Sequence, residues 1–223
     1  LKVIFVSLFL STILGIIIGL SRTCNNILLK IFSSFYITII RQTPLLLQLM
    51  FWYFVGFLGL KNNFIYFSNL FKINNQGIDF FGLSLTSEFS ALIIGLSVFT
   101  SAFIAEVIRG GIISVPKGQW ESFRSLGLSE SNGLIRVIIP QALPAIIPGL
   151  TNQFLNLAKN STLAIAIGYS DIYAINDTII NQTGRAIECF IILLFTFLIL
   201  NLLITNLMET INKLINKKKI YIN

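Results

Sequence analysis

The sequence contains no histidine, only two cysteines and few charged residues. Charged side chains make up 11% of the 223 residues, less than half the share of about 25% that is usual in a soluble domain. Without histidine, the common zinc sites, Ser-His-Asp triads and imidazole proton relays are excluded. We therefore expect no catalytic residue and no metal site in this chain.

The chain has two cysteines and a net charge of +7. The arrangement of these residues argues against a disulfide-bonded protein and against a nucleic-acid-binding protein. Cys24 and Cys189 lie far apart in the sequence, and we expect two buried apolar thiols rather than a disulfide. The basic residues do not cluster with exposed aromatic residues, because the 20 phenylalanines lie within apolar runs. The chain is therefore not expected to bind nucleic acid.

Long apolar runs dominate what the sequence does contain, since 55% of its residues are hydrophobic and the mean hydropathy is +0.83. A bilayer core of about 30 Å needs roughly 20 apolar residues in a helix. Five runs approach this length, and the second contains Arg41 and is broken by Pro44. We expect an all-α polytopic membrane protein, forming one domain over residues 1–223, with spans at about 3–20, 31–60, 89–105, 137–158 and 189–208.

The distribution of lysine and arginine predicts the orientation of these spans. Ten basic residues follow the first, third and fifth spans: Arg22, Lys30, Arg109, Lys117, Arg124, Arg136, Lys213, Lys217, Lys218 and Lys219. The alternate segments hold three, Lys61, Lys72 and Arg185. Because cytoplasmic segments carry the excess of basic residues, we expect the N-terminus outside and the C-terminus in the cytoplasm.

The cytoplasmic segment 106–140 is expected to form two short helices joined at a glycine. Pro116 is typical of a helix start, Leu126-Gly127-Leu128 of a helix end, and Ser129 of a second N-cap. An apolar stripe on the first helix comprises Trp120, Phe123 and Leu126. Such a helix pair either lies in the lipid interface or docks into a groove on another protein.

Several motifs in the sequence resemble those of the amino-acid permeases of ATP-binding-cassette (ABC) importers. Glu121-Ser122-Phe123, Gly127 and Val137-Ile138-Ile139-Pro140 have the spacing of that family's cytoplasmic loop signature. The resemblance extends over the whole chain, and its other motifs are at residues 41–48, 105–111, 116–119, 156–169 and 181–188. The most similar members are the general L-amino-acid permeases and the glutamate/glutamine/aspartate permeases.

The resemblance implies a five-helix, type I importer permease core in the bacterial inner membrane. Two separate ATPase subunits would bind ATP and Mg, and this chain would hold no cofactor; its sequence contains no G-x-x-x-x-G-K-[ST] loop. A second permease subunit, favoured to be a different chain, and a periplasmic solute-binding protein would complete the complex. Residues expected to couple to the ATPase are Gln119, Trp120, Glu121, Arg124 and Gly127, where Glu121 either contacts the ATPase or caps its helix.

Polar residues that interrupt the spans indicate where a substrate would pass, because such groups are costly in lipid. One cluster, around Pro44, comprises Gln42, Thr43 and Gln48. The other follows prolines 140, 144 and 148, which are expected to break the fourth span, and comprises Gln153, Asn156, Lys159, Asn160, Ser161 and Thr162. A short apolar piece, Leu163–Gly168, is too short to cross the membrane and is expected to be a half-helix or a re-entrant element.

The chemistry of the second cluster favours import of L-amino acids that are neutral or acidic, or of a broad range of them. Lys159, or the backbone amides of Ser161 and Thr162, would bind the substrate carboxylate, and the cluster holds no carboxylate that would select a basic side chain. Alternatively, Lys159 extends to the headgroups or pairs with a carboxylate. Arg41 is expected to bond the carbonyls at the break rather than the substrate.

Other functions remain open at this point. The same architecture could import a different small polar amine, such as an opine. An ion-coupled secondary transporter is a further alternative, although the spans hold few carboxylates for ion coupling. A membrane scaffold protein is the alternative outside transport.

Overall fold

The computed structural model describes residues 1–24, 26–60, 65–68, 71–74, 76–80 and 83–220, so Lys61 lies outside the described residues. Within them, four helical segments are long and apolar enough to cross a bilayer: Lys2–Thr23, Ser87–Ile113, Glu130–Ile167 and Ala186–Lys217. These segments include the predicted spans at 3–20, 89–105, 137–158 and 189–208. Each observed segment is longer than the run that predicted it.

The predicted span at 31–60 is divided into several helices rather than one. Helix α2 (Ile27–Gln42) ends before Pro44, and α3 (Leu45–Met50) continues as a π-helical segment, Phe51–Phe57. Thr43 is extended, with φ −107° and ψ 137°, because a residue before proline is disfavoured in the helical region. The break at Pro44 is thus confirmed, whereas the count of five crossings stays a prediction.

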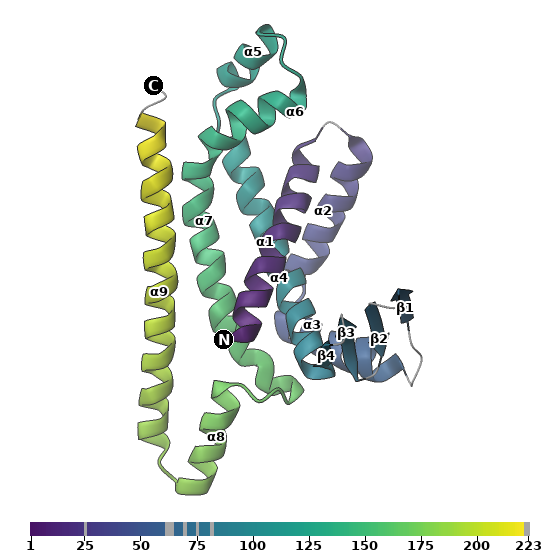
Figure 1. The fold of residues 1–223 in the computed structure, drawn as a ribbon, viewed down its shortest axis with the longest axis vertical. Coiled ribbons are helices and arrows are strands. Elements are labelled where there is room, and N and C mark those ends of the chain that lie inside the picture. The colour runs from purple at the N-terminus through teal and green to yellow at the C-terminus, as the bar shows by residue number, and fades with distance from the viewer. Residues whose placement is uncertain (25, 61–64, 69–70, 75, 81–82, 221–223) are drawn as a thin grey trace.

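Helix α1 (Lys2–Thr23) packs closely on α4 (Ser87–Ile113) through small side chains. Its buried small residues recur every four positions, at Ser7, Ser11, Gly15 and Gly19. A Cβ atom at Gly15 would lie 2.6 Å from the Cβ atom of Ile104 on α4. Small residues at this spacing let two membrane helices approach closely. Helix α4 contacts both α1 and α7, and α1 crosses it in Figure 1.

Helix α7 (Ile139–Asn160) passes through Pro144 and Pro148 without a break, so the expected break at the prolines is wrong. Their four-residue spacing confines the carbonyls that lose a donor to one face of the helix. Before Pro140 the chain widens into a π-helical turn, Leu134–Ile138, which accommodates its ring. The α-helix instead ends at Asn160, where a 3-10 helix, Ser161–Ile167, begins and then ends at Gly168. The predicted half-helix is therefore present as a 3-10 helix.

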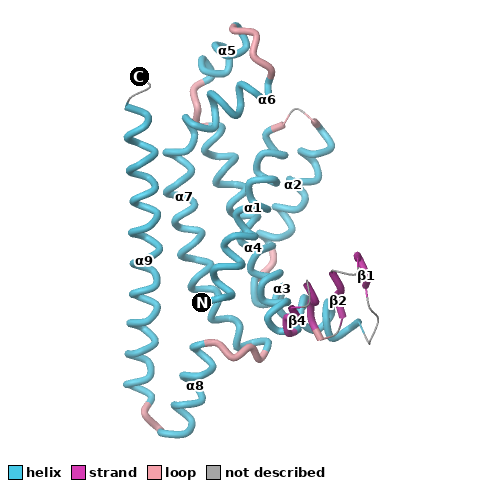
Figure 2. The backbone as a smooth tube through the Cα atoms, viewed as in Figure 1, coloured by secondary structure: helices cyan, strands magenta, loops and turns pink. Residues whose placement is uncertain are grey.

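A small antiparallel sheet packs against α4 and was not predicted. Its strands β1 (Ile65–Ser68), β2 (Phe71–Asn74), β3 (Gly77–Phe80) and β4 (Leu83–Thr86) pair in sequence order (Figure 2). Its register places Lys72 opposite Asp79. The alternation of apolar and polar residues in Gly77–Phe80 and Leu83–Thr86 is the sequence signal of these strands.

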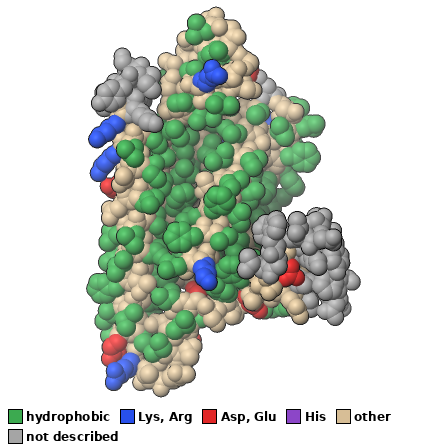
Figure 3. Space-filling view, viewed as in Figure 1, with side chains coloured by type: hydrophobic (Ala, Val, Ile, Leu, Met, Phe, Trp, Pro, Cys, Tyr) green, Lys and Arg blue, Asp and Glu red, His purple; other side chains and the backbone are tan. Residues whose placement is uncertain are grey.

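The remaining helices form the opposite side of the molecule. Helix α8 (Ile172–Thr183) turns at Gly184, φ +69°, into α9 (Ala186–Ile220), which packs along α7. Figure 3 shows a predominantly hydrophobic flank with sparse charges, as expected of a surface in contact with lipid. Cys24 and Cys189 are free thiols, but only Cys189 is buried, so the expected burial of Cys24 is wrong.

Different elements lie at the two ends of the molecule. Helices α5 (Lys117–Ser125) and α6 (Glu130–Gly133) lie at the same end of the molecule as the last turns of α9 (Figure 1). The start of α1, helix α8 and the sheet lie toward the opposite end. This arrangement agrees with the charge pattern, which places segment 106–140 and the C-terminal tail on the same side of the membrane.

Candidate functional site: a projecting hairpin and two polar pockets

The α5–α6 hairpin (residues 117–133) encloses one buried ring. Phe123 is 1% exposed and packs in a cluster with Ile138, Trp120 and Leu128. A Cβ atom at Gly133 would lie 2.6 Å from Cγ of the Phe123 ring, so only glycine lets α6 approach α5 this closely. The hairpin is therefore packed as a unit, as the predicted pair of helices joined at a glycine requires.

Gly127 ends α5 with a complete Schellman motif. The amide of Gly127 donates to the Arg124 carbonyl at 2.9 Å, and the amide of Leu128 donates to the Phe123 carbonyl at 3.2 Å. Gly127 has φ +71°, a conformation that glycine adopts without strain. Ser129 then caps α6 by accepting from the Asn132 amide at 3.4 Å, so both predicted signals are confirmed.

Polar contacts close the hairpin and join it to α7. Arg124 donates from Nε to Glu130 Oε1 at 2.8 Å, and its guanidinium lies 5.6 Å from the Phe123 ring centre. These hydrogen bonds hold the pKa of Glu130 below its ordinary value. Gln119 Oε1 accepts from Gln141 Nε2 at 2.9 Å.

Two exposed side chains mark the free surface of the hairpin. Glu121 is the fifth residue of α5, whose N-cap is Pro116, so the alternative that Glu121 caps the helix is wrong. Leu126 is 76% exposed and does not share the apolar face formed by Trp120 and Phe123, so its predicted place in that stripe is also wrong. An acidic and an apolar side chain are thus left exposed on one short hairpin.

The predicted polar cluster on α7 contributes to a pocket between α7 and α4. This pocket, here called the amide pocket, has a volume of about 420 Å³ and is lined by Phe99, Thr100, Phe103, Gln153, Asn156, Lys159 and Asn160. The structure therefore brings together four of the six predicted residues on this segment. It places a cation beside three amides, a set of groups suited to a zwitterion.

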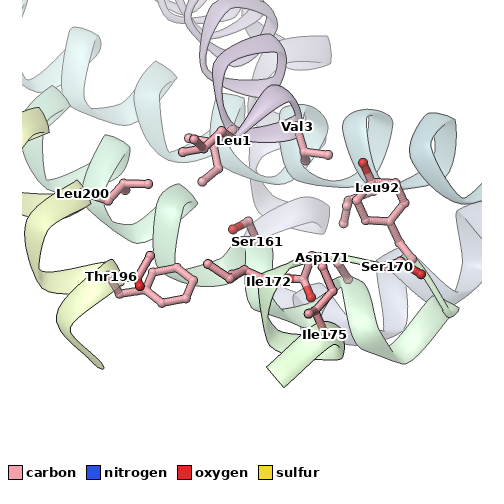
Figure 4. Close-up of a pocket in the computed structure, with 14 residues that line it drawn as sticks. Leu1, Val3, Leu92, Ser161, Ser170, Asp171, Ile172, Ile175, Thr196 and Leu200 are labelled. Atoms are coloured by element: carbon pink, nitrogen blue, oxygen red, sulfur yellow. The ribbon is translucent and has the colours of Figure 1, made fainter. Parts of the chain in front are cut away.

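Ser161 and Thr162 lie outside the amide pocket. Ser161 is buried, donates to the Ala158 carbonyl at 2.8 Å and lines a separate pocket of about 400 Å³. Figure 4 shows that pocket between the starts of α1 and α8 and helix α9, with Asp171 at its edge. Thr162 donates to the Lys159 carbonyl at 2.8 Å.

The side chains of the cluster around Pro44 have different surroundings: Gln48 and Thr43 are hydrogen-bonded to each other at the break, whereas Gln42 lines a pocket. Gln48 is buried, and its Nε2 donates to the Ile40 carbonyl at 2.9 Å and to Thr43 Oγ1 at 2.6 Å. Gln48 thus bonds the carbonyl end of α2, the task that we expected of Arg41, and that expectation is wrong. Gln42 instead lines a second polar pocket.

This second pocket, here called the arginine pocket, has a volume of about 270 Å³. Its lining residues are Arg22, Ile37, Thr38, Arg41, Gln42, Phe103 and Glu106. The Arg41 guanidinium lies 5.1 Å from the centre of the Phe103 ring. These residues come from α1, α2 and α4, so the pocket lies where the three helices meet.

An ion cluster beside the arginine pocket was missed by sequence reasoning. Glu106 pairs with Arg22 of α1 and, at 2.9 Å, with Arg109 of α4. A carboxylate in the last two turns of an apolar helix, three residues before an arginine, was the available signal. Its partner on α1 could not be identified without knowing that α1 packs on α4.

An apolar helical bundle with polar pockets along its central helix and a projecting hairpin defines a membrane-embedded transport subunit. Residues 11–217 match the family described as "binding-protein-dependent transport system inner membrane component", and the chain belongs to this family. The family-level resemblance seen in the sequence motifs is therefore confirmed.

Three relatives illustrate the similarity. The chain is 51% identical to the general L-amino acid transport system permease protein AapQ of Rhizobium johnstonii, over 56% of this chain and 31% of that protein. It is 43% identical to the glutamate/glutamine/aspartate/asparagine transport system permease protein BztB of Rhodobacter capsulatus, over 62% and 33%. The L-cystine transport system permease protein TcyL of Bacillus subtilis is 30% identical, over 86% and 78%. The matches thus span about a third of AapQ and BztB.

Two solved structures have a similar fold. An amino acid ABC transporter crystallised with histidines superposes with a TM-score of 0.74 and 31% identity, covering 95% of this chain and 88% of that one. The inward-facing MetNI methionine ABC transporter also has a TM-score of 0.74, at 20% identity, covering 96% and 91%. The second comparison concerns the fold alone.

Proposed function

We propose that this chain is the membrane subunit of an ATP-driven importer of L-amino acids that are neutral, acidic or of a broad range. The observation that carries the proposal is the α5–α6 hairpin, packed around Phe123, projecting from the bundle and leaving Glu121 and Leu126 exposed. A rigid hairpin transmits the closure of a partner domain to α4 and α7 as a rigid-body displacement. Its termini join these two helices directly.

The proposed partners follow from this role. Two ATPase subunits bind ATP and Mg and contact the hairpin around Gln119, Trp120, Glu121, Arg124 and Gly127. A second permease subunit, favoured to be a different chain, encloses the pathway with this one. A solute-binding protein delivers substrate at the opposite end, which places the N-terminus outside and the C-terminus in the cytoplasm of a bacterial inner membrane. The names of the relatives AapQ and BztB support this proposal.

The amide pocket supports the choice of substrate. Lys159 provides a cation for the α-carboxylate, while the amide oxygens of Gln153, Asn156 and Asn160 provide acceptors for the α-ammonium. The pocket lining contains no carboxylate, so it has no strong partner for a basic side chain. A small polar amine such as an opine fits the same groups and is the second candidate substrate.

Copurification of the tagged chain from its native cell in mild detergent, with mass spectrometry of the retained proteins, tests the proposal. We expect an ATPase subunit and a second permease to be retained. A variant that replaces exposed Glu121 and Leu126 with lysine and serine should lose the ATPase and keep the second permease. The replacement of exposed Lys213 on α9 by glutamine serves as the control. Recovery of the chain alone in several detergents would favour a secondary transporter or a scaffold.

A further inference from the structure

The amide pocket and the arginine pocket share one side chain. Phe103 lines both of them. Phe99, Phe103 and Glu106 are spaced by four and three residues, so they lie on one face of α4. Since α4 leads toward α5, the arginine pocket lies closer to the α5–α6 hairpin than the amide pocket does. The two pockets therefore follow one another along a single helix face.

The charges in the arginine pocket are unevenly compensated. Glu106 is paired with Arg22 and Arg109. Among the ion pairs of the described residues, none involves Arg41, whose guanidinium instead stacks over Phe103. Stacking uses the face of a guanidinium and leaves its in-plane N–H groups directed away from the ring. Those groups form a planar fork that matches a carboxylate.

We propose that the arginine pocket is a second binding station for an α-amino acid, with Arg41 binding the α-carboxylate and Phe103 separating the two stations. This inference rests on the proposed function. The substrate carboxylate passes from Lys159 in the amide pocket to Arg41 in the arginine pocket, on the way to the end that carries the hairpin. Every L-amino acid carries this carboxylate, so the second station recognises the backbone of the substrate and not its side chain.

A purely structural role for Arg41 makes a different prediction. In that role, the stack on Phe103 only holds α2 against α4, an interface that Tyr36 also joins by bonding the Val98 carbonyl at 2.9 Å. Replacing Phe103 with leucine, which keeps the bulk and removes the ring, would then have the same effect as removing the charge of Arg41. A readout of carboxylate recognition separates the two roles.

The experiment measures binding of radiolabelled L-glutamine to the complete complex in nanodiscs, with the solute-binding protein omitted. Unlabelled L-glutamine and its α-amide, which lacks the carboxylate, serve as competitors. We expect Arg41→Gln to reduce the preference for the carboxylate form by about tenfold, the size of a lost charge-assisted hydrogen bond. Lys159→Gln is the comparator for the amide pocket, and Phe103→Leu, which removes the ring and leaves the charge of Arg41, should reduce the preference less than Arg41→Gln does.

The outcomes separate this inference from the proposed function. A wild-type complex that neither binds nor transports any of a panel of L-amino acids overturns the proposed function itself. A wild-type complex that transports L-glutamine, with an unchanged preference in Arg41→Gln, overturns only the second station. Equal losses in Arg41→Gln and Phe103→Leu also overturn it, because they assign Arg41 to helix packing.

Discussion

Gly127 combines an unusual backbone conformation with open space around it. Its φ of +71° favours glycine, yet a Cβ atom placed there would meet nothing within 4 Å. Steric crowding therefore cannot be the reason that a side chain is disfavoured at this position. The relevant cost is backbone strain of about 1–2 kcal/mol, which is smaller for asparagine than for other side chains.

The effect of replacing Gly127 on uptake per ATP should depend on the backbone strain that the new residue introduces and not on the size of its side chain. We expect Gly127→Val to loosen the hairpin, so that ATP hydrolysis by the complex continues with less uptake per ATP, because the Schellman motif no longer forms without strain. Gly127→Asn should stay close to wild type. Amino-acid uptake and phosphate release, measured together in proteoliposomes, check this. Equal losses in the two variants would mean that strain at Gly127 is not the cause.

Asp171, the N-cap residue of α8, has a carboxyl pKa that differs between the folded and the unfolded protein. Burial raises the pKa of its carboxyl group, although the Ala174 amide donates to it at 2.9 Å and lowers that pKa in part. The folded protein therefore holds this proton more tightly than the unfolded chain. The stabilising contribution is complete below the unfolded pKa of about 3.9 and is lost as the pH rises through the folded pKa.

Asp171→Asn should remove this pH dependence, since asparagine caps a helix as well as aspartate does. The thermal unfolding midpoint of the wild type, relative to the variant, should fall as the pH rises above the unfolded pKa of about 3.9. Thermal scans in detergent at several pH values measure the difference, with exposed Asp177→Asn as the matched control. A difference that is constant with pH, or that rises with pH, contradicts the assignment.

At the scale of the elements, the contact of α1 with α4 depends on the absence of side chains. Gly15→Leu should destabilise the fold by about 1–3 kcal/mol, the usual cost of overpacking, because its Cβ atom would collide with Ile104. Gly110→Leu on α4 is the control, since its Cβ atom would meet nothing within 4 Å. Thermal unfolding midpoints check this, and equal effects of the two substitutions would refute the packing argument.

The break between α2 and α3 is held by hydrogen bonds from one side-chain amide, that of Gln48. Gln48→Leu leaves the Ile40 carbonyl and the Thr43 hydroxyl without this donor, and we expect it to lower stability by about 1–3 kcal/mol. Thr43→Val is the matched variant, because it removes the hydroxyl that accepts from Gln48 and keeps the bond of Gln48 to the Ile40 carbonyl. Unfolding midpoints and transport KM are both measured. An unchanged midpoint with a raised KM would instead support the sequence-based assignment of Gln48 to the substrate pathway.

At the scale of the whole molecule, apolar run lengths predicted four of the expected spans, and cap residues predicted the hairpin. These features are local, so the sequence alone carries them. The Arg22–Glu106 pair and the packing of Gly15 on Ile104 depend on which helices are neighbours, which no local pattern specifies. Pro144 and Pro148 misled the prediction, because a helix tolerates prolines whose orphaned carbonyls share one face.

In the proposed function, ATP hydrolysis by a partner is transmitted through the α5–α6 hairpin and drives amino-acid movement past this chain. Uptake of radiolabelled L-glutamine and L-glutamate into proteoliposomes that contain the complete complex tests it most directly. We expect uptake only with ATP on the hairpin side and the solute-binding protein on the other side, and loss of uptake when Glu121 and Leu126 are replaced. Uptake driven by a proton or sodium gradient without ATP would contradict it.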